Sequence, residues 1–296
     1  MSKKAFVTGA TGFVGSHLVR ALLKADWNVS VVARPSSNLD VLAAVRDDIT
    51  VYEYSGEIQS LTDAISICKP DVVIHVASLF LSEHQPEQVH ALIESNILFG
   101  NHLLEAMVAS DVKCFINTST SWEHYENKDY SPVNLYAATK RAFQDIMQFY
   151  VEAKGIQAIT LKLFDTYGAD DPRPKLMNLL KRIAETGEML SMSPGEQEID
   201  LVHIDDVVQA YLIAAQRFLD GKVTGHEIYG VGSGNPTTLK QLVAILEKET
   251  GRKINIEWGG RSYRDREVMG VWNCYDSIED WIPKINLIEV LKGIHK

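Results

Sequence analysis

The chain has 296 residues and a mass of 33.1 kDa, which allows one large domain or two ordinary ones. Hydrophobic residues make up 46% and charged residues 23%, so the composition excludes collagen-like, coiled-coil and disordered chains. The formal net charge of -10 argues against a nucleic-acid partner but still allows a local basic pocket for a phosphate.

Apolar stretches and cysteines give no sign of a membrane or extracellular protein. The longest uncharged apolar stretch, residues 72–82, is shorter than the ~20 residues of a membrane span, and no secretory signal is visible. The three cysteines are far apart, with no CxxC or Cys/His cluster, which argues against disulfides and metal sites. We therefore expect a protein of the reducing cytoplasm that binds no metal and no membrane.

Short strands alternate with helices through the first half of the chain. Strands are expected at residues 5–9, 29–33, 50–54, 71–77, 114–118 and 158–163, and helices at residues 13–24, 86–109 and 136–153. Several strand segments are apolar at nearly every position, as in a sheet that is buried on both faces. This alternation predicts an α/β fold, a Rossmann-type doubly wound parallel sheet with right-handed crossovers.

The pattern changes after residue 163. A turn-rich break at residues 170–174 is followed by helical patterns at residues 176–186, 205–219 and 238–250 and by a strand pattern at residues 227–231. We expect a dinucleotide-binding domain over residues 1–165, to which residues 201–236 return. Residues 166–200 and 237–296 form a smaller C-terminal α/β substrate lobe. The cleft is expected at the carboxyl ends of the strands.

A glycine-rich turn joins the first expected strand to the first expected helix. Residues 8–15 read TGATGFVG, with the three glycines at GxxGxxG spacing. Glycines at such a turn permit a tight bend, a close approach of the backbone to a pyrophosphate, and packing of the helix on the strand. The pyrophosphate then lies at the helix N-terminus, where backbone N–H groups are free.

The residues after the second strand indicate which dinucleotide binds. A carboxylate there usually accepts hydrogen bonds from the adenosine ribose, whereas an arginine accommodates a 2′-phosphate. Arg34 stands at this place, followed by Ser36 and Ser37, whose hydroxyls can donate further hydrogen bonds. The sequence therefore favours NADP(H) and leaves NAD(H) open.

A tyrosine and a lysine at YxxxK spacing begin the expected helix at residues 136–153. Tyr136 and Lys140 lie on one helix face, and the ammonium is expected to lower the pKa of the phenol toward the working pH. Thr120, among clustered hydroxyls that follow the strand at residues 114–118, is placed to hydrogen-bond a substrate oxygen beside Tyr136. These three residues are the candidate catalytic set.

The chain resembles the extended short-chain dehydrogenases/reductases, the NAD-dependent epimerase/dehydratase family. The resemblance covers nearly the whole length and is carried by the glycine turn, residues 73–77, Asn96, the catalytic set, residues 167–168 and residues 200–206. It implies that Thr120 polarises a carbonyl, that Tyr136 is the acid/base, and that Lys140 tunes Tyr136 and holds the nicotinamide ribose. It also implies a homodimer formed by the helices at residues 86–109 and 136–153.

The resemblance completes the candidate site. The expected cofactor-binding residues are Gly9, Thr11, Gly12, Phe13, Val14, Gly15, Arg34, Ser36, Ser37, Glu57, Ile58, Val76, Ala77, Ser78, Asn96, Thr118, Tyr136, Lys140 and Leu163. The expected substrate-binding residues are Leu79, Thr120, Ser121, Trp122, His124, Asp165, Lys175 and Arg264, with Arg173 as a further cation for a diphosphate. Asp165 stands where the family usually has asparagine.

Departures from the family pattern favour a reductase. Related dehydratases follow the threonine with an Asp-Glu pair, but Thr120 is followed by Ser121 and Trp122. Epimerases keep one NAD bound and usually have an acidic residue at the position of Arg34. Residues 122–125 and 132–140 are similar to CDP-abequose synthases and related 4-ketoreductases of 6-deoxyhexoses. The resemblance therefore implies NADPH-dependent reduction of a CDP-, UDP- or dTDP-linked 4-keto-6-deoxy sugar.

Three alternatives stay open. The first is a nucleotide-sugar 4-epimerase with bound NAD. The second is a small-molecule carbonyl reductase of the flavanonol/cinnamoyl reductase type, which needs no diphosphate site and hence no Arg264. The third is a non-catalytic NADP-sensing regulator, a class that typically lacks the Tyr136–Lys140 pair found in this chain.

Overall fold

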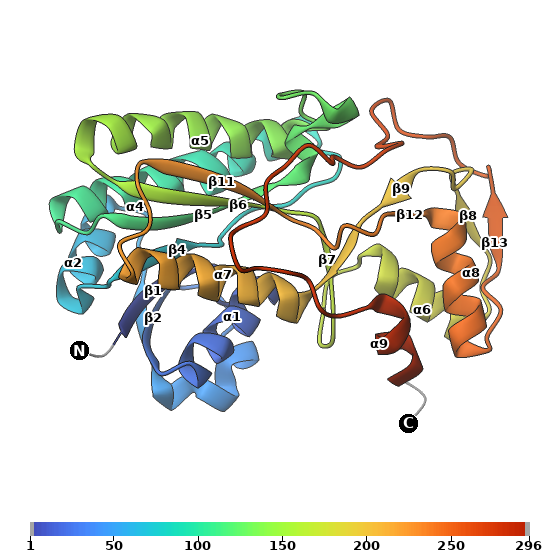
Figure 1. Ribbon diagram of the computed structural model, residues 1–296, viewed down its shortest axis with the longest axis horizontal. Helices are drawn as coiled ribbons and strands as arrows, with labels where there is room; N and C mark the ends of the chain where they lie inside the picture. The colour runs from blue at the N-terminus through green and yellow to red at the C-terminus, as the bar shows by residue number, and fades with distance from the viewer. Residues whose placement is uncertain (1–2, 294–296) are drawn as a thin grey trace.

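The computed structural model describes residues 3–293, which fold around a seven-stranded sheet (Figure 1). Its strands are β1 (Lys3–Thr8), β2 (Trp27–Ala33), β3 (Ile49–Glu53), β4 (Val72–His75), β5 (Cys114–Thr120), β6 (Gln157–Leu163) and β11 (His226–Val231). They lie in the order β3-β2-β1-β4-β5-β6-β11, and each neighbouring pair is parallel. The prediction of a Rossmann-type doubly wound sheet is confirmed.

Helices cover both faces of this sheet, as its apolar strands require. On one face α1 (Phe13–Lys24) packs with α7 (Ile204–Leu219), and on the other α2 (Ile58–Cys68), α4 (Phe99–Ala109) and α5 (Leu135–Lys154) pack together. Successive strand residues point to opposite faces, so Val7 and Ile116 join the first core while Phe6 and Phe115 join the second. The helix α2 is not among the predicted ones, although Leu61, Ala64 and Ile65 are buried at the spacing of one helix face, so its signal was present in the sequence.

The helix expected over residues 86–109 is not continuous. It consists of a 3₁₀ turn, η2 (Pro86–Gln88), the short helix α3 (Val89–Ile93), a π-helical segment, η3 (Glu94–Leu98), and α4. The π segment contains Asn96, whose buried side chain is bonded to the backbone of Leu79 on the loop after β4. The prediction of one uninterrupted helix is therefore wrong, because a tertiary contact accompanies a wider turn at this point.

A smaller lobe lies beyond the carboxyl ends of the strands. Its helices are α6 (Leu176–Thr186), α8 (Leu239–Thr250) and α9 (Leu287–Gly293), and its strands pair as β7 (Asp165–Tyr167) with β10 (Leu201–His203), β9 (Glu198–Ile199) with β12 (Thr237–Thr238), and β8 (Leu190–Met192) with β13 (Ile256–Trp258). Leu180, Leu242 and Leu246 are buried in a third core that these helices share. The strands of this lobe are too short for periodicity to reveal them.

Three further 3₁₀ segments complete the description of residues 3–293: η1 (Asp40–Asp48), η4 (Ser121–Glu123) and η5 (Tyr125–Asn127). The segment η4 directly follows β5 and begins at its carboxyl end. Within the same residues, no helix combines the length and the apolar character that crossing a membrane requires.

Candidate active site

The glycine turn after β1 brings three backbone segments into close contact. Gly9 has a φ of 71°, and a Cβ atom on it would lie 2.5 Å from the backbone nitrogen of Ala77. A Cβ atom on Gly15 would lie 2.1 Å from the carbonyl oxygen of Gly9. Only glycine therefore allows both the turn and the packing of α1 against it. Gly12 precedes α1 without a side-chain cap, which leaves N–H groups of the first turn free for an anion.

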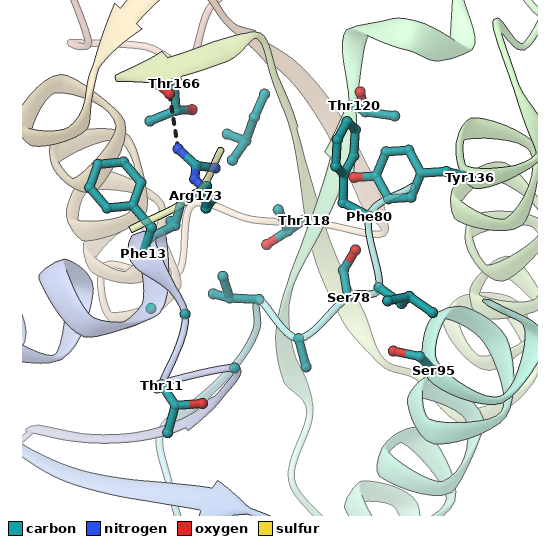
Figure 2. Close-up of a pocket in the computed structure, with 18 of the residues that line it drawn as sticks. Thr11, Phe13, Ser78, Phe80, Ser95, Thr118, Thr120, Tyr136, Thr166 and Arg173 are labelled. Carbon is teal, nitrogen blue, oxygen red and sulfur yellow. Dashed lines mark hydrogen bonds between the residues drawn. The ribbon is translucent and has the colours of Figure 1, made fainter. Parts of the chain in front are cut away.

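A cavity of about 520 Å³ extends from this turn to the ends of β4 and β5. The turn and the first residues of α1 line its lower left part in Figure 2, and Ser78, Phe80, Thr120 and Tyr136 line its right side. Of the expected cofactor-binding residues, those that line this cavity are Gly9, Thr11, Gly12, Phe13, Val14, Gly15, Arg34, Ser37, Val76, Ala77, Ser78, Thr118, Tyr136 and Leu163.

The other five expected cofactor residues do not line the cavity. Glu57 and Ile58 begin α2, and Ser36 lies exposed on the loop after β2. Asn96 is fully buried, and its side-chain amide is bonded to both backbone groups of Leu79 and to Thr139 Oγ1. These four residues therefore lie outside the cavity lining, at the start of a helix, on an exposed loop or in a contact that braces a loop. Lys140, the fifth residue, is fully buried and does not line the cavity.

Arg34 lies at the edge of the cavity, directly after β2. Its backbone N–H donates to Ser37 Oγ at 3.1 Å, and the Ser37 N–H donates back to the Arg34 carbonyl at 2.9 Å. This turn holds the backbone while the Arg34 side chain remains exposed at the cavity edge. A guanidinium in this place can pair with a phosphate through two parallel hydrogen bonds.

The catalytic candidates come from β5 and the first turns of α5. Asn134 caps α5 by accepting a hydrogen bond from the Ala137 N–H at 2.9 Å, which fixes the direction of the helix at Tyr136. Thr120 ends β5, and its Oγ1 accepts a hydrogen bond from the Trp122 N–H at 3.2 Å. The Thr120 hydroxyl proton is thus free to point into the cavity. Figure 2 shows Thr120, Tyr136 and Ser78 around the same part of the cavity.

Burial controls the protonation of Tyr136. Burial raises its pKa to about 12, while a hydrogen bond with Ser78 has the opposite, smaller effect and Glu123 adds to the rise. The expectation that Lys140 lowers the pKa of this phenol is therefore wrong, because desolvation is the largest effect and the carboxylates of Glu123 and Asp165 act in the same direction. Tyr136 holds its proton at neutral pH and is ready to donate it.

Lys140 is fully buried, and its Nζ has no hydrogen-bond partner within residues 3–293. Burial lowers the pKa of Lys140 to about 8, although Glu123 acts against this change. A buried ammonium without a partner is costly, so its donors fit the hydroxyl groups of a bound ribose. The free N–H groups at the glycine turn, and the unpaired Lys140 one helical turn after Tyr136, fit a nicotinamide dinucleotide.

A buried ion pair lies behind the end of β5. Glu123 accepts a hydrogen bond from Ser119 Oγ, and its other carboxylate oxygen lies 2.9 Å from Lys162 Nζ. Lys162 also donates to His124 Nε2 at 2.7 Å, while His124 Nδ1 bonds the Lys128 carbonyl at 3.0 Å. His124 therefore lines the site with both ring nitrogens already engaged.

A second cavity of about 330 Å³ adjoins the first and reaches into the C-terminal lobe. Arg264 lines it and is paired with Glu267 at 2.8 Å. Lys175 lines both cavities and lies 3.8 Å from Asp165. All eight expected substrate residues line one cavity or both: Leu79, Thr120, Ser121, Trp122, His124, Asp165, Lys175 and Arg264. Arg173 lines the first cavity and lies over the ring of Phe13.

Several cavity residues escaped the sequence reasoning. Tyr54 and Phe99 line the first cavity, and their ring centroids lie 4.8 Å apart. Tyr54 directly follows β3, so its place at the carboxyl edge of the sheet was an available signal. Phe80 lies on an irregular loop, and no periodicity marks it. In residues 3–293, no three His, Cys, Asp or Glu side chains are grouped to hold a metal ion.

The fold and this cavity agree with what comparison with known proteins shows. Residues 5–232 match the profile of the NAD-dependent epimerase/dehydratase family. The chain belongs to that family. A CDP-abequose synthase from Salmonella muenchen is 30% identical over 297 residues, which cover 96% of this chain and 97% of the relative.

Solved structures of two UDP-glucose 4-epimerases share the fold of nearly the whole chain. A UDP-glucose 4-epimerase from Thermotoga maritima, solved with UDP-glucose, is 25% identical, with a TM-score of 0.84 over 98% of this chain and 96% of that one. A UDP-glucose 4-epimerase from Thermus thermophilus, solved with NAD, is 21% identical, with a TM-score of 0.81 over 98% and 96%. At that identity the second likeness concerns the fold alone.

Proposed function

We propose that this protein catalyses the NADPH-dependent reduction of a nucleotide-activated 4-keto-6-deoxy sugar to the 4-hydroxy sugar. The nucleotide is CDP, UDP or dTDP. The observation that carries the proposal is that Arg34 and the pair Thr120–Tyr136 line one continuous cavity. Arg34, which can bind a 2′-phosphate, and Tyr136, which can donate a proton, would therefore act on the same bound dinucleotide.

The cofactor assignment rests on the charge at the edge of the cavity. Arg34 stands where a carboxylate would otherwise accept hydrogen bonds from the adenosine ribose. Ser37 lines the cavity beside it and can donate to the same phosphate. The free N–H groups at the start of α1 would hold the pyrophosphate, and the Lys140 ammonium would hold the nicotinamide ribose. When bound, the cofactor supplies a hydride.

The substrate assignment rests on the second cavity. A nucleotide sugar carries a diphosphate, which needs cations in a chain whose formal net charge is -10. Arg264 offers its guanidinium in this cavity, and a diphosphate would replace Glu267 as its partner. Lys175 lies where the two cavities join. The similarity to a CDP-abequose synthase over almost the full length supports a nucleotide sugar.

The residues of the chain perform the proton side of the reaction. The Thr120 hydroxyl donates a hydrogen bond to the ketone oxygen and stabilises the charge that develops there. As the hydride adds to the carbonyl carbon, the C=O π electrons move to oxygen, which takes the Tyr136 proton. Because Ser121 and Trp122 follow Thr120, the acid and base pair for water elimination is absent from these two positions.

A 4-epimerase is the second candidate, and the similarity to the UDP-glucose 4-epimerase of Thermotoga maritima favours it. An epimerase keeps one NAD bound, for which a carboxylate after the second strand is usual. Arg34 stands at that place at the cavity edge, which favours an exchangeable NADPH and hence a reduction.

Cofactor stoichiometry separates the two candidates. The protein is incubated with NADPH and the 4-keto-6-deoxyglucose esters of CDP, UDP and dTDP, and NADPH loss and sugar product are both quantified. A reductase consumes one NADPH for each alcohol formed. Interconversion of UDP-glucose and UDP-galactose without added NADPH, and no reduction of any keto sugar, would overturn the proposal in favour of the epimerase.

A further inference from the structure

Phe80 stands at the junction of the two cavities and has no role in the chemistry described above. It lies on the loop after β4 and lines both the first and the second cavity. Its side chain is 42% exposed, so the ring is available to a molecule that occupies the junction. Figure 2 shows the ring beside that of Tyr136, on the side that faces the cavity.

The backbone that carries Phe80 is held firmly. Asn96 Oδ1 accepts a hydrogen bond from the Leu79 N–H at 2.7 Å, and Asn96 Nδ2 donates to the Leu79 carbonyl at 3.0 Å. The same amide donates to Thr139 Oγ1 at 3.0 Å, which ties the loop to α5. The residue before Phe80 is thus fixed relative to the helix that carries Tyr136. We therefore expect the loop that carries Phe80 to keep its position when a ligand binds.

Phe80 and Trp122 form a continuous aromatic wall beside the catalytic phenol. The ring centroids of Phe80 and Tyr136 lie 5.0 Å apart at 78°, and those of Phe80 and Trp122 lie 5.6 Å apart. Lys175 Nζ lies 4.9 Å from the Phe80 centroid, but Asp165 is its charge partner. Arg264 lies over Trp122 and is paired with Glu267. The cations beside the wall are therefore already balanced.

The wall limits what can lie next to the reacting carbonyl. A ketone within reach of Tyr136 and Thr120 would also lie beside the Phe80 ring, which contacts Tyr136. A substituent on one of the two carbons next to the ketone would then meet Phe80 and Trp122. An aromatic face offers dispersion contacts to a methyl group but no hydrogen bond to a hydroxyl. A hydroxymethyl or carboxylate substituent would lose hydration against the rings, and the nearby Lys175 and Arg264 side chains already pair with Asp165 and Glu267.

We propose that Phe80, with Trp122, determines substrate specificity by selecting a sugar with a methyl group, rather than a hydroxymethyl or carboxylate group, on the carbon next to the ketone. The inference rests on the proposed function and deepens it, because it assigns the 6-deoxy preference to a particular wall. Phe80 acts by shaping the site and takes no part in proton transfer.

The test measures the reverse reaction, in which NADP⁺ takes the hydride from C4 and Tyr136 takes the hydroxyl proton. The substrates are the 6-deoxyglucose and glucose esters, and the 6-deoxygalactose and galactose esters, of CDP, UDP and dTDP. For the nucleotide and C4 configuration that react, we expect wild-type kcat/KM to favour the 6-deoxy sugar about 100-fold. Phe80→Ser should reduce this ratio to below about 10, whereas Phe80→Leu should keep it within about threefold of wild type because the wall stays apolar.

Two controls separate specificity from damage to the fold. Ile67→Ser changes an exposed apolar residue on α2 that is outside both cavities, and it should leave the ratio unchanged. The Kd for NADPH should stay within about threefold of wild type in Phe80→Ser, because the glycine turn is intact. A wild-type ratio near one, or an unchanged ratio in Phe80→Ser, would overturn the inference while leaving the reductase in place. If none of the CDP, UDP or dTDP sugars reacts, the proposed function is overturned, and this inference with it.

Discussion

The buried Glu123–Lys162 pair gives the sharpest quantitative prediction for the fold. The Lys162 and Glu123 side chains are 2% and 0% exposed, and their charged atoms lie 2.9 Å apart. Glu123→Gln keeps a partner for Ser119 but leaves the Lys162 ammonium buried without its counter-charge. Breaking such a pair costs about 3–5 kcal/mol of unfolding free energy. Lys162→Met should cost a similar amount because it leaves the carboxylate alone.

The double variant tests the reasoning directly. Glu123→Gln with Lys162→Met removes both charges, so we expect it to lose about 2–3 kcal/mol less than the sum of the single losses. Urea denaturation followed by tryptophan fluorescence measures all three variants. Lys240→Met, in the exposed pair with Glu196, serves as the control and should cost less than about 1 kcal/mol. Additive single losses, or a Glu123→Gln loss as small as that of the control, would refute the argument.

Three further predictions concern the cavity. Tyr136→Phe should lower kcat about 10²- to 10⁴-fold while NADPH still binds, and near-wild-type turnover would contradict the role of the phenol. Arg34→Ala should weaken NADPH binding about 10- to 100-fold and leave NADH binding nearly unchanged, since it removes a charge-assisted contact; equal effects in a titration of both cofactors would disprove this. Burial lowers the pKa of Lys140 from 10.5 to about 8, so the unfolded chain binds more protons between these values and wild-type stability should rise with pH across that window. Lys140→Met should lose this contribution to the rise and lose reduction, without losing stability at pH 7; an unchanged pH dependence in denaturation curves would argue against it.

Sequence patterns predicted those parts of the site whose geometry is set by residues close together in the chain. The turn at Gly9 and Gly15 has its strand and helix beside it in the chain, and parallel topology places the carboxyl end of β1 next to that of β4, which in turn neighbours β5. The i,i+4 spacing puts Tyr136 and Lys140 on one helix face. Spacing cannot reveal desolvation, however, and desolvation decides both pKa values.

Contacts between distant segments were beyond the reach of the sequence. Asn96 braces Leu79 through a π-helical turn, and no periodicity distinguishes such a residue from one that meets the cofactor. Glu123 and Lys162 lie on different elements, and their pairing depends on the register of β5 and β6, which places Lys162 opposite Ser119, rather than on any motif. Phe80 lines the cavity from an irregular loop, so no pattern in the sequence predicts its position either.

The most direct test of the account follows the hydride itself. The protein is supplied with NADPH that carries deuterium at the transferable C4 position, together with a nucleotide-linked 4-keto-6-deoxy sugar, and the product is examined by mass spectrometry and NMR. We expect one deuterium at C4 of each sugar product with the wild-type protein, and no labelled product with Tyr136→Phe in the same time. Sugar product without the label would contradict hydride transfer from NADPH in this cavity.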